Sequence, residues 1–139
     1  MTDPAHTPLR HERVFAVAAE DIDGQGHVNN LVYLRWIQDV AIEHWGGAAR
    51  PRDQASTAWV VVRHEIDYLK PALLGDEVVA RTWVEVWKGA TSERHTELER
   101  RGDGVMLARG RTVWCALDAV TRRPKRVTSE MSEPFHDQG

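Results

Sequence analysis

The chain has 139 residues, with 18 lysines and arginines against 21 aspartates and glutamates, and a formal net charge of -3. This length suits one domain with a real core and is too short for separate cofactor and substrate domains. Because the two signs of charge are intermixed along the chain, no basic stripe can neutralise a phosphate backbone, and we expect no nucleic-acid partner.

Cysteine use and hydropathy predict the compartment. Cys115 is the single cysteine, so no internal disulfide can form, which fits a reducing environment, and the alternation around it indicates a structural strand position. The first residues lack the pattern of an export signal, and no apolar run is long enough to span a bilayer. We therefore expect a cytoplasmic protein that has no membrane partner.

The chain is expected to form one domain over residues 1–139. Residues 1–10 carry two prolines and no periodicity, so we expect a flexible lead into a strand at about 11–19. The tail, about 120–139, is expected to add only an extended segment, with about 135–139 flexible.

A helix is predicted between residue 30 and about residue 45, because apolar residues recur there at three- and four-residue steps. Asn29 or Asn30 can cap its start. The pair Gly46-Gly47 predicts its end, since glycine accepts the left-handed conformation of a helix C-cap, and Pro51 supports that stop.

After the helix the apolar period changes from 3.6 to two, which predicts a helix laid against a sheet. The alternating segments are 57–69, 77–87, 92–101 and 105–117. Turns containing glycine separate them, and Gly102-Asp-Gly104 is suited to a hairpin.

The first two of these strands raise a question about their outer face. If the even positions from 58 to 68 and from 78 to 86 face the core, several large apolar side chains face outward. They are Trp59, Val61, Trp83 and Trp87. Because a large exposed apolar patch usually marks an interface, we expect this face to pack against another subunit. The alternative is that a one-residue bulge reverses the faces.

Residues 21–33, Asp21-Ile-Asp23-Gly-Gln-Gly26-His27-Val-Asn29-Asn30-Leu-Val-Tyr33, are the most informative segment. They place a carboxylate on a turn loosened by glycine, next to two possible cap residues and the start of the helix. This arrangement can hold a general base beside unpaired helix N–H groups, where an oxyanion could be stabilised. The pattern indicates a hydrolytic site. The alternative is that Asp21, Asp23 and Gly26 are turn residues with a purely conformational role.

Metal and nucleotide motifs are missing from the sequence. The seven histidines show no paired zinc spacing, and His64 falls on the apolar face of its strand, which suggests a hydrogen-bonded core histidine. Gly24 and Gly26 lie near a helix start without a P-loop lysine or a Rossmann fingerprint. We expect no metal and no cofactor.

The order of elements resembles that of the hotdog fold, in particular that of the 4-hydroxybenzoyl-CoA thioesterase-like acyl-CoA thioesterases. This order is one strand, a loop with D-x-D-x-x-G-H-V-N-N, a long helix and then four strands. Supporting segments are Tyr33-Leu-Arg-Trp36, Tyr68 to Asp76, and Arg122-Arg-Pro124-Lys-Arg126. The resemblance covers nearly the whole chain. It implies an α+β fold with a five- to six-stranded antiparallel sheet wrapped around one long central helix. It also implies a homodimer or homotetramer with active sites at the subunit boundary.

The resemblance also implies roles for particular residues. Asp23, the second Asp of D-x-D, would be the catalytic carboxylate, acting as general base or as a nucleophile that forms a mixed anhydride. The backbone N–H of Asn30 would polarise the thioester carbonyl. His27 is a further candidate catalytic residue, which would orient the loop or touch substrate; the alternative is a hydrogen-bonded turn histidine. Some members carry His or Tyr at the position of Asn30 and Tyr at the position of Ala19, but a backbone donor survives both differences.

The implied substrate is an acyl thioester of coenzyme A or of acyl carrier protein, so coenzyme A enters as part of the substrate. Candidate substrate-binding residues are Gly26, Val28, Asn29, Tyr33, Lys88, Thr91 and Ser92. The last three belong to a turn where the family often places nucleotide contacts. A second hotdog lineage carries its carboxylate on the helix, but because Asp23 fills that role we expect Glu43 to be a surface residue.

Hydrolysis of an acyl-CoA thioester is thus the leading hypothesis. One alternative is a hydratase of enoyl thioesters on the same fold, which uses an Asp/His pair to move a proton on a substrate carbon. Another is a non-catalytic acyl-CoA binding module. The sequence does not identify the acyl group, whose length depends on the side chains that line the pocket.

Overall fold

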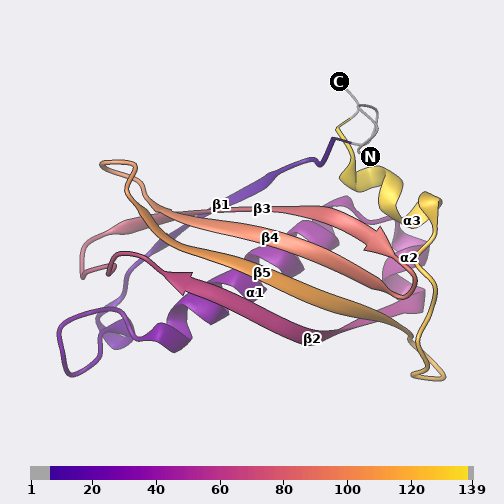
Figure 1. The fold of residues 1–139 in the computed structure, drawn as a ribbon, viewed down its shortest axis with the longest axis horizontal. Coiled ribbons are helices and arrows are strands. Elements are labelled where there is room, and N and C mark those ends of the chain that lie inside the picture. The colour runs from indigo at the N-terminus through magenta and orange to yellow at the C-terminus, as the bar shows by residue number, and fades with distance from the viewer. Residues whose placement is uncertain (1–6, 138–139) are drawn as a thin grey trace.

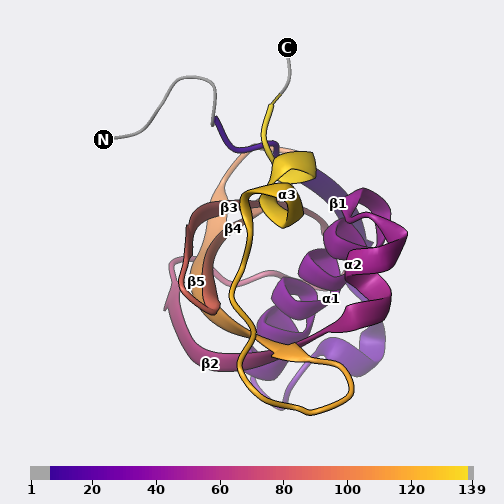
Figure 2. The same ribbon diagram turned by 90° about the vertical axis from the view of Figure 1, so that its right-hand side faces the viewer.

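The computed structural model describes residues 7–137. One antiparallel sheet, in the order β1-β3-β4-β5-β2, curls around the long helix α1 (Figures 1 and 2). The strands are β1 (His11–Ala16), β2 (Thr57–Tyr68), β3 (Glu77–Lys88), β4 (Thr91–Arg100) and β5 (Met106–Asp118). The helical elements are η2 (Ala19–Asp21), α1 (Asn30–Ala48), α2 (Pro51–Ser56), α3 (Ser129–Ser132) and η3 (Glu133–Phe135). The predicted sheet around one central helix is confirmed, with five strands.

The start of α1 follows the sequence prediction. Asn29 is the N-cap, and its Oδ1 accepts a hydrogen bond from the backbone N–H of Leu31 at 2.9 Å. The buried side chains recur at helical spacing and face the sheet. Trp36, Ile37 and Val40 are nearly or fully buried and lie in the main core cluster. The helix is therefore held by its apolar side.

The predicted end of α1 was wrong. Gly46 and Gly47 are helical, α1 continues to Ala48, and Pro51 begins α2 instead of only marking a stop. Glycine costs roughly 1 kcal/mol in a helix interior, so something must offset two of them. Trp45 and Ala48 pack against a second core cluster, which supplies tertiary contacts that a local pattern does not reveal.

Two β-bulges overturn the predicted sheet faces over part of β2 and β3, whereas Val78, Ala80, Thr82 and Val84 are buried as predicted. The register shifts between Val61 and Arg63 in β2, and between Val84 and Val86 in β3. Each bulge reverses the alternation, so Val62 becomes 61% exposed although an inward position was predicted. Trp59 and Trp87 turn inward instead. Their rings pack edge to face, with ring centroids 6.3 Å apart.

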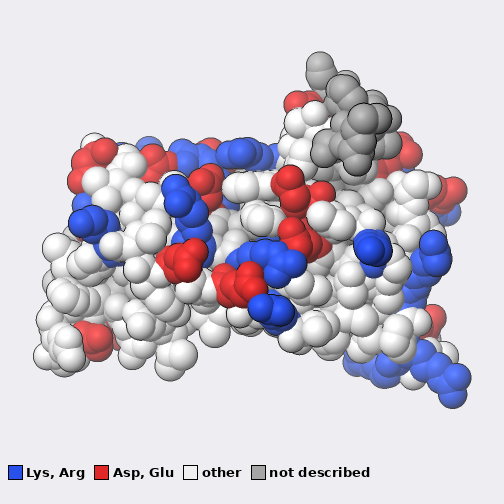
Figure 3. All heavy atoms as spheres, in the orientation of Figure 1, with Lys and Arg blue, Asp and Glu red and all other residues white. Residues whose placement is uncertain are grey.

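The premise of the predicted apolar interface is therefore wrong for Trp59 and Trp87, and the subunit contact itself stays a prediction. Trp83 stays on that face, but the Arg10 guanidinium lies 4.2 Å from its ring centroid and the ring of His95 stacks on it. Around it, ion pairs join Arg81 and Arg111 to glutamates of neighbouring strands. Figure 3 shows this mixture of positive and negative side chains over the sheet.

The C-terminal segment forms part of the core, which corrects the prediction of a merely extended tail. It adds α3 and η3, and Phe135 is fully buried against Trp45 and His44 with ring centroids at 5.6 and 4.8 Å. Leu9, in the predicted flexible lead, donates its N–H to the carbonyl of Phe135 at 2.9 Å. Of the ends expected to be flexible, residues 1–6 and 138–139 lie outside the described residues.

Among residues 7–137, no helix combines the length and the apolar character needed to cross a membrane.

Replacing Phe135 by Ala should lower the free energy of unfolding by about 3–5 kcal/mol, because it removes a fully buried ring and leaves a cavity. Urea unfolding followed by circular dichroism measures this. The matched control is Val120→Ala, at a side chain that is 90% exposed, for which a change within about 0.5 kcal/mol is expected. Equal effects of the two variants would show that the tail does not stabilise the core.

Candidate active site

The loop between η2 and α1 is folded back on itself. Ile22 and Val28 form an isolated antiparallel bridge, and the N–H of Asp23 donates to the carbonyl of His27 at 2.8 Å. Gly26 has a φ of 82°, in the left-handed region that favours glycine, and its N–H donates to the carbonyl of Asp23. Gly26 therefore shapes the turn that carries Asp23 and His27.

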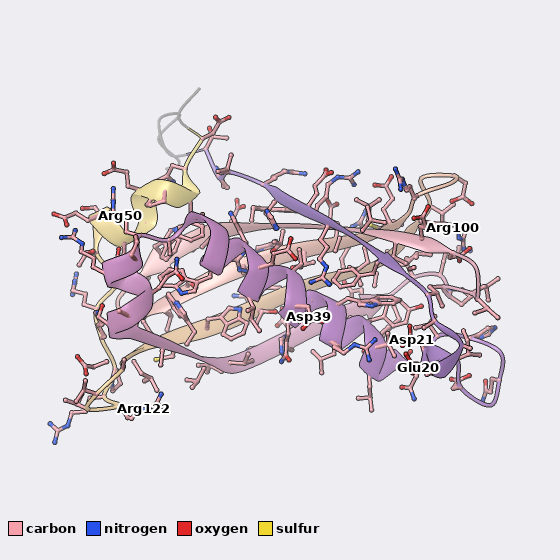
Figure 4. The ribbon with its side chains drawn as sticks, turned by 180° about the vertical axis from the view of Figure 1, so that it is seen from behind. Glu20, Asp21, Asp39, Arg50, Arg100 and Arg122 are labelled. Carbon is pink, nitrogen blue, oxygen red and sulfur yellow. The ribbon has the colours of Figure 1, made fainter. Side chains whose placement is uncertain are left out.

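The two aspartates of this loop have different environments. Asp21 is buried, and its carboxylate accepts the N–H of Ala18 at 2.9 Å and the Arg35 guanidinium at 3.0 Å. Its backbone carbonyl accepts the N–H of Asn29 at 2.8 Å. Asp21 thus joins the loop to the start of α1, and Figure 4 shows it at that end, with Arg50 beyond the other end of the helix. Its role is structural.

Asp23 is exposed and keeps one carboxylate oxygen available. Its Oδ1 accepts the backbone N–H groups of Gln25 and His27 at 2.9 and 3.4 Å. Within the described residues, no hydrogen bond reaches its Oδ2 or uses the N–H of Asn30, the first residue of α1. A carboxylate oxygen and a helix-start donor are both left for a ligand.

These groups line one cleft of about 460 Å³. Six residues predicted as site residues border it: Asp23, His27, Val28, Asn29, Asn30 and Tyr33. A carboxylate residue, Asp23, and the first residue of α1, Asn30, at the positive end of the helix dipole, therefore border the same space. Such an arrangement can activate water and stabilise an oxyanion.

Tyr33 fixes the opposite wall of the cleft. Its phenol oxygen accepts the N–H of Ala72 at 2.8 Å, and burial raises the pKa of Tyr33 above its ordinary value. Arg100 donates to the carbonyl of Pro71 at 3.0 Å and pairs with Asp76. The segment after β2 is thereby held against the start of α1.

The wall formed by this segment was missed as a site by the sequence reasoning. Tyr68, Leu69, Lys70 and Pro71 all border the cleft. Tyr68, predicted to face the core, is 47% exposed. Its hydroxyl donates a hydrogen bond to the carbonyl of Asn30 at 3.4 Å. The signal available was the Lys-Pro pair directly after a strand, a turn that contains one exposed cation.

Three predicted substrate contacts lie elsewhere. Lys88 and Thr91 form the β3–β4 turn, closed by a hydrogen bond of 2.9 Å from the Thr91 hydroxyl to the Lys88 carbonyl. Ser92 is buried and borders a different pocket, together with Trp45 near the far end of α1. Figure 1 shows the β3–β4 turn and the start of α1 at opposite ends of the molecule. Within one protomer, these residues do not reach the Asp23 cleft.

The remaining candidates behave as predicted. The Nδ1 of His64 is 2.9 Å from the Thr112 hydroxyl, so the predicted hydrogen bonding is confirmed; the residue is half-buried, and this burial lowers its pKa. Glu43 pairs with His11 and Arg13, each at 3.0 Å, on the surface. Among residues 7–137, no three His, Cys, Asp or Glu side chains gather to hold a metal ion.

Residues 17–135 match the Thioesterase-like superfamily. The chain belongs to this superfamily. A search of curated proteins finds no match. Among solved structures, a thioesterase from Thermus thermophilus, complexed with coenzyme A and Zn, is 26% identical with a TM-score of 0.79, covering 91% of this chain and 97% of that one.

Two further structures show the fold. The 1,4-dihydroxy-2-naphthoyl-CoA thioesterase from Synechocystis is 16% identical with a TM-score of 0.78, over 91% of this chain and 95% of that one. The probable thioesterase YbaW from Escherichia coli is 22% identical with a TM-score of 0.78, over 88% of this chain and 94% of that one. The hotdog fold predicted for this superfamily member is confirmed.

Substitutions at the two loop aspartates should change the free energy of unfolding by different amounts. Asp21→Ala removes the acceptor of a part-buried N–H and the partner of Arg35, so a loss of about 2 kcal/mol in unfolding free energy is expected. Asp23→Asn keeps Oδ1 as an acceptor on an exposed turn, and a change within about 0.5 kcal/mol is expected. Chemical denaturation of both variants checks this, and an equal or reversed order would contradict the assigned roles.

Proposed function

We propose that this chain is a cytoplasmic acyl-CoA thioesterase, which hydrolyses an acyl thioester to a free acid and coenzyme A. The observation that carries the proposal is that the Asp23 carboxylate and the unengaged N–H of Asn30 border the same cleft at the start of α1. Membership of the Thioesterase-like superfamily supports the reaction class. The coenzyme A bound by the Thermus thioesterase supports the carrier.

In the proposed reaction, the thioester carbonyl oxygen accepts the N–H of Asn30, where the helix contributes about half a positive charge. Oδ2 of Asp23 takes a proton from water as the water oxygen bonds to the carbonyl carbon. The C–S bond then breaks, and the proton passes to the departing thiolate, which needs little acid assistance. Turn N–H groups on Oδ1 hold the carboxylate in place.

Nucleophilic attack by Asp23 is the second route. Oδ2 would then bond to the carbonyl carbon and expel the thiolate, and water would hydrolyse the mixed anhydride. Label found in the protein after hydrolysis in H₂¹⁸O under single-turnover conditions would identify the anhydride route. General-base hydrolysis puts the label into the product acid alone, whereas water attack on the Asp23 side of an anhydride labels the protein.

Binding of the carrier is proposed to involve more than one chain. Lys70 supplies a cation on the edge of the cleft for a phosphate group. Lys88 and Thr91 would contribute only from a second copy, because they lie at the other end of their own protomer, whereas Ser92 is buried and borders a different pocket. The acyl carrier protein remains the alternative carrier.

A homodimer through β2 is the simplest assembly that would join two copies. β2 is an edge strand of the sheet, and Val60 and Val62 on it are exposed. An exposed edge with apolar side chains favours pairing with another strand. A homotetramer would build on the same dimer.

Replacing Asp23 by Asn should reduce kcat/KM for acyl-CoA hydrolysis by about 100-fold or more, because the base or nucleophile is lost. Thiol release from a panel of acyl-CoAs, followed with a thiol-reactive dye, measures it, and Glu43→Gln is the matched control with near-wild-type turnover. Near-wild-type turnover of Asp23→Asn would exclude both routes.

The alternative functions predict other results with the same acyl-CoAs. Water addition to an enoyl-CoA without thiol release would favour a hydratase. Binding without either reaction would favour a non-catalytic module.

Light scattering at micromolar concentration should give a mass of at least twice the 15.8 kDa of one chain. Val62→Lys should shift the equilibrium towards the monomer, since it places a charge in the proposed joint between sheets. The control is Val86→Lys, an exposed valine on β3, a strand paired on both sides. A monomeric wild-type mass would contradict the assembly.

A further inference from the structure

A second pocket lies beside the C-terminal half of α1. It is bordered by the indole rings of Trp45, Trp59, Trp87 and Trp114, together with Ser92 and Arg94. Because α1 rises about 1.5 Å per residue, Trp45 lies roughly 20 Å along the helix from Asn30 in the Asp23 cleft. The two sites are therefore separate within one chain.

Arg94 is the unusual member of this pocket. Its residue is only 5% exposed, and its hydrogen bonds within the described residues use one nitrogen, Nη1, to His44 Nδ1 at 2.9 Å and to the Thr82 hydroxyl at 3.2 Å. Within residues 7–137 no carboxylate forms an ion pair with it, whereas Arg81, Arg100 and Arg111 each have acidic partners. A buried charge without a counter-charge is costly.

His44 does not neutralise this charge. Burial first, and then the neighbouring Arg94, lower the pKa of His44 to about 3, so the imidazole is neutral at physiological pH. A neutral imidazole can accept the Arg94 N–H through Nδ1. Burial also lowers the pKa of Arg94, to about 9, which still leaves the guanidinium protonated near neutral pH.

Three indole groups of the same pocket add unpaired donors. The Nε1 atoms of Trp59, Trp87 and Trp114 are buried, and none has a hydrogen-bond partner in the part of the chain that the structure describes. Buried donors without acceptors are uncommon in folded proteins. The residues that border the pocket thus carry apolar rings, a guanidinium and unpaired indole N–H groups, and none of them is acidic.

We propose that this pocket binds a small apolar carboxylate, of the size of benzoate or a short-chain fatty acid. The carboxylate would accept N–H groups of Arg94 beyond those held by His44 and Thr82, and the apolar body would pack on the indole rings. The pocket volume is about 80 Å³, which at 10–15 Å³ per water corresponds to roughly five to eight water-sized positions. A phosphate is disfavoured because most of the wall is apolar.

The wild-type chain provides the first test. Benzoate and benzamide have nearly the same shape, but only benzoate is charged. Isothermal titration should give a Kd for benzoate at least about tenfold lower than for benzamide, because only benzoate compensates Arg94. Equal affinities, or no detectable benzoate binding at millimolar concentration, would overturn the proposal.

Variants then locate the binding. Arg94→Gln should abolish the preference for benzoate over benzamide, and Arg94→Lys, which keeps the charge, should restore part of it. Asp23→Asn should leave benzoate affinity unchanged within about twofold, because the Asp23 cleft is a separate site. A preference that survives Arg94→Gln, or one that disappears in Asp23→Asn, would overturn the assignment.

Indole resonances give a readout that does not depend on the stability of any variant. In ¹⁵N-labelled wild-type protein, benzoate should shift the Nε1–H signals of Trp59, Trp87 and Trp114. The signal of Trp83, which lies on the outer sheet face, should stay in place. The opposite pattern would place the ligand elsewhere. This inference does not require thioesterase activity, so its outcome is independent of the hydrolysis assay.

Discussion

The buried carboxylate of Asp21 is the interaction on which the candidate active site depends. One of its oxygens accepts the N–H of Ala18 and the other accepts Arg35, while its backbone carbonyl accepts the N–H of the cap residue Asn29. Asp21 thereby joins the residues before the loop, through Ala18, to the start of α1, through Asn29 and Arg35. Asp23, two residues later, keeps a fixed position at the start of α1 although its side chain is exposed.

The single helix inside a curved sheet creates two different environments. At its N-terminal end, the backbone N–H of Asn30, unpaired within residues 7–137, and several polar side chains belong to residues that border an open cleft. At its C-terminal end, the two bulges turn Trp59 and Trp87 inward, and Phe135 from the tail packs beside them. The two proposed sites therefore lie at opposite ends of one helix.

Local patterns predicted much of this structure. The Asn29 cap, the helix start, the strands and the D-x-D loop all depend on residues within a few positions of one another. All appear as expected, except that the first strand ends at Ala16 instead of about residue 19. The resemblance to hotdog thioesterases added the fold. Features set by distant contacts were missed: the helical Gly46-Gly47 pair is stabilised by packing, and Phe135 is buried by a core that no local window contains.

The bulges explain the other errors. A period of two predicts faces correctly only while the register is unbroken, and one extra residue at Val62 exchanged the two sides of β2. The same shift concealed the tryptophan pocket around Arg94. Tyr68 and Lys70 were missed as site residues because only the folded chain brings the end of β2 beside Asn30.

A crystal structure with a non-hydrolysable acyl-CoA analogue, in which a methylene group replaces the thioester sulfur, tests the central claim most directly. The account predicts that the carbonyl oxygen lies about 2.7–3.1 Å from the backbone nitrogen of Asn30, with Asp23 Oδ2 facing the carbonyl carbon directly or through one water. An analogue bound with its carbonyl away from the start of α1, or with Asp23 turned to bulk solvent, would contradict it.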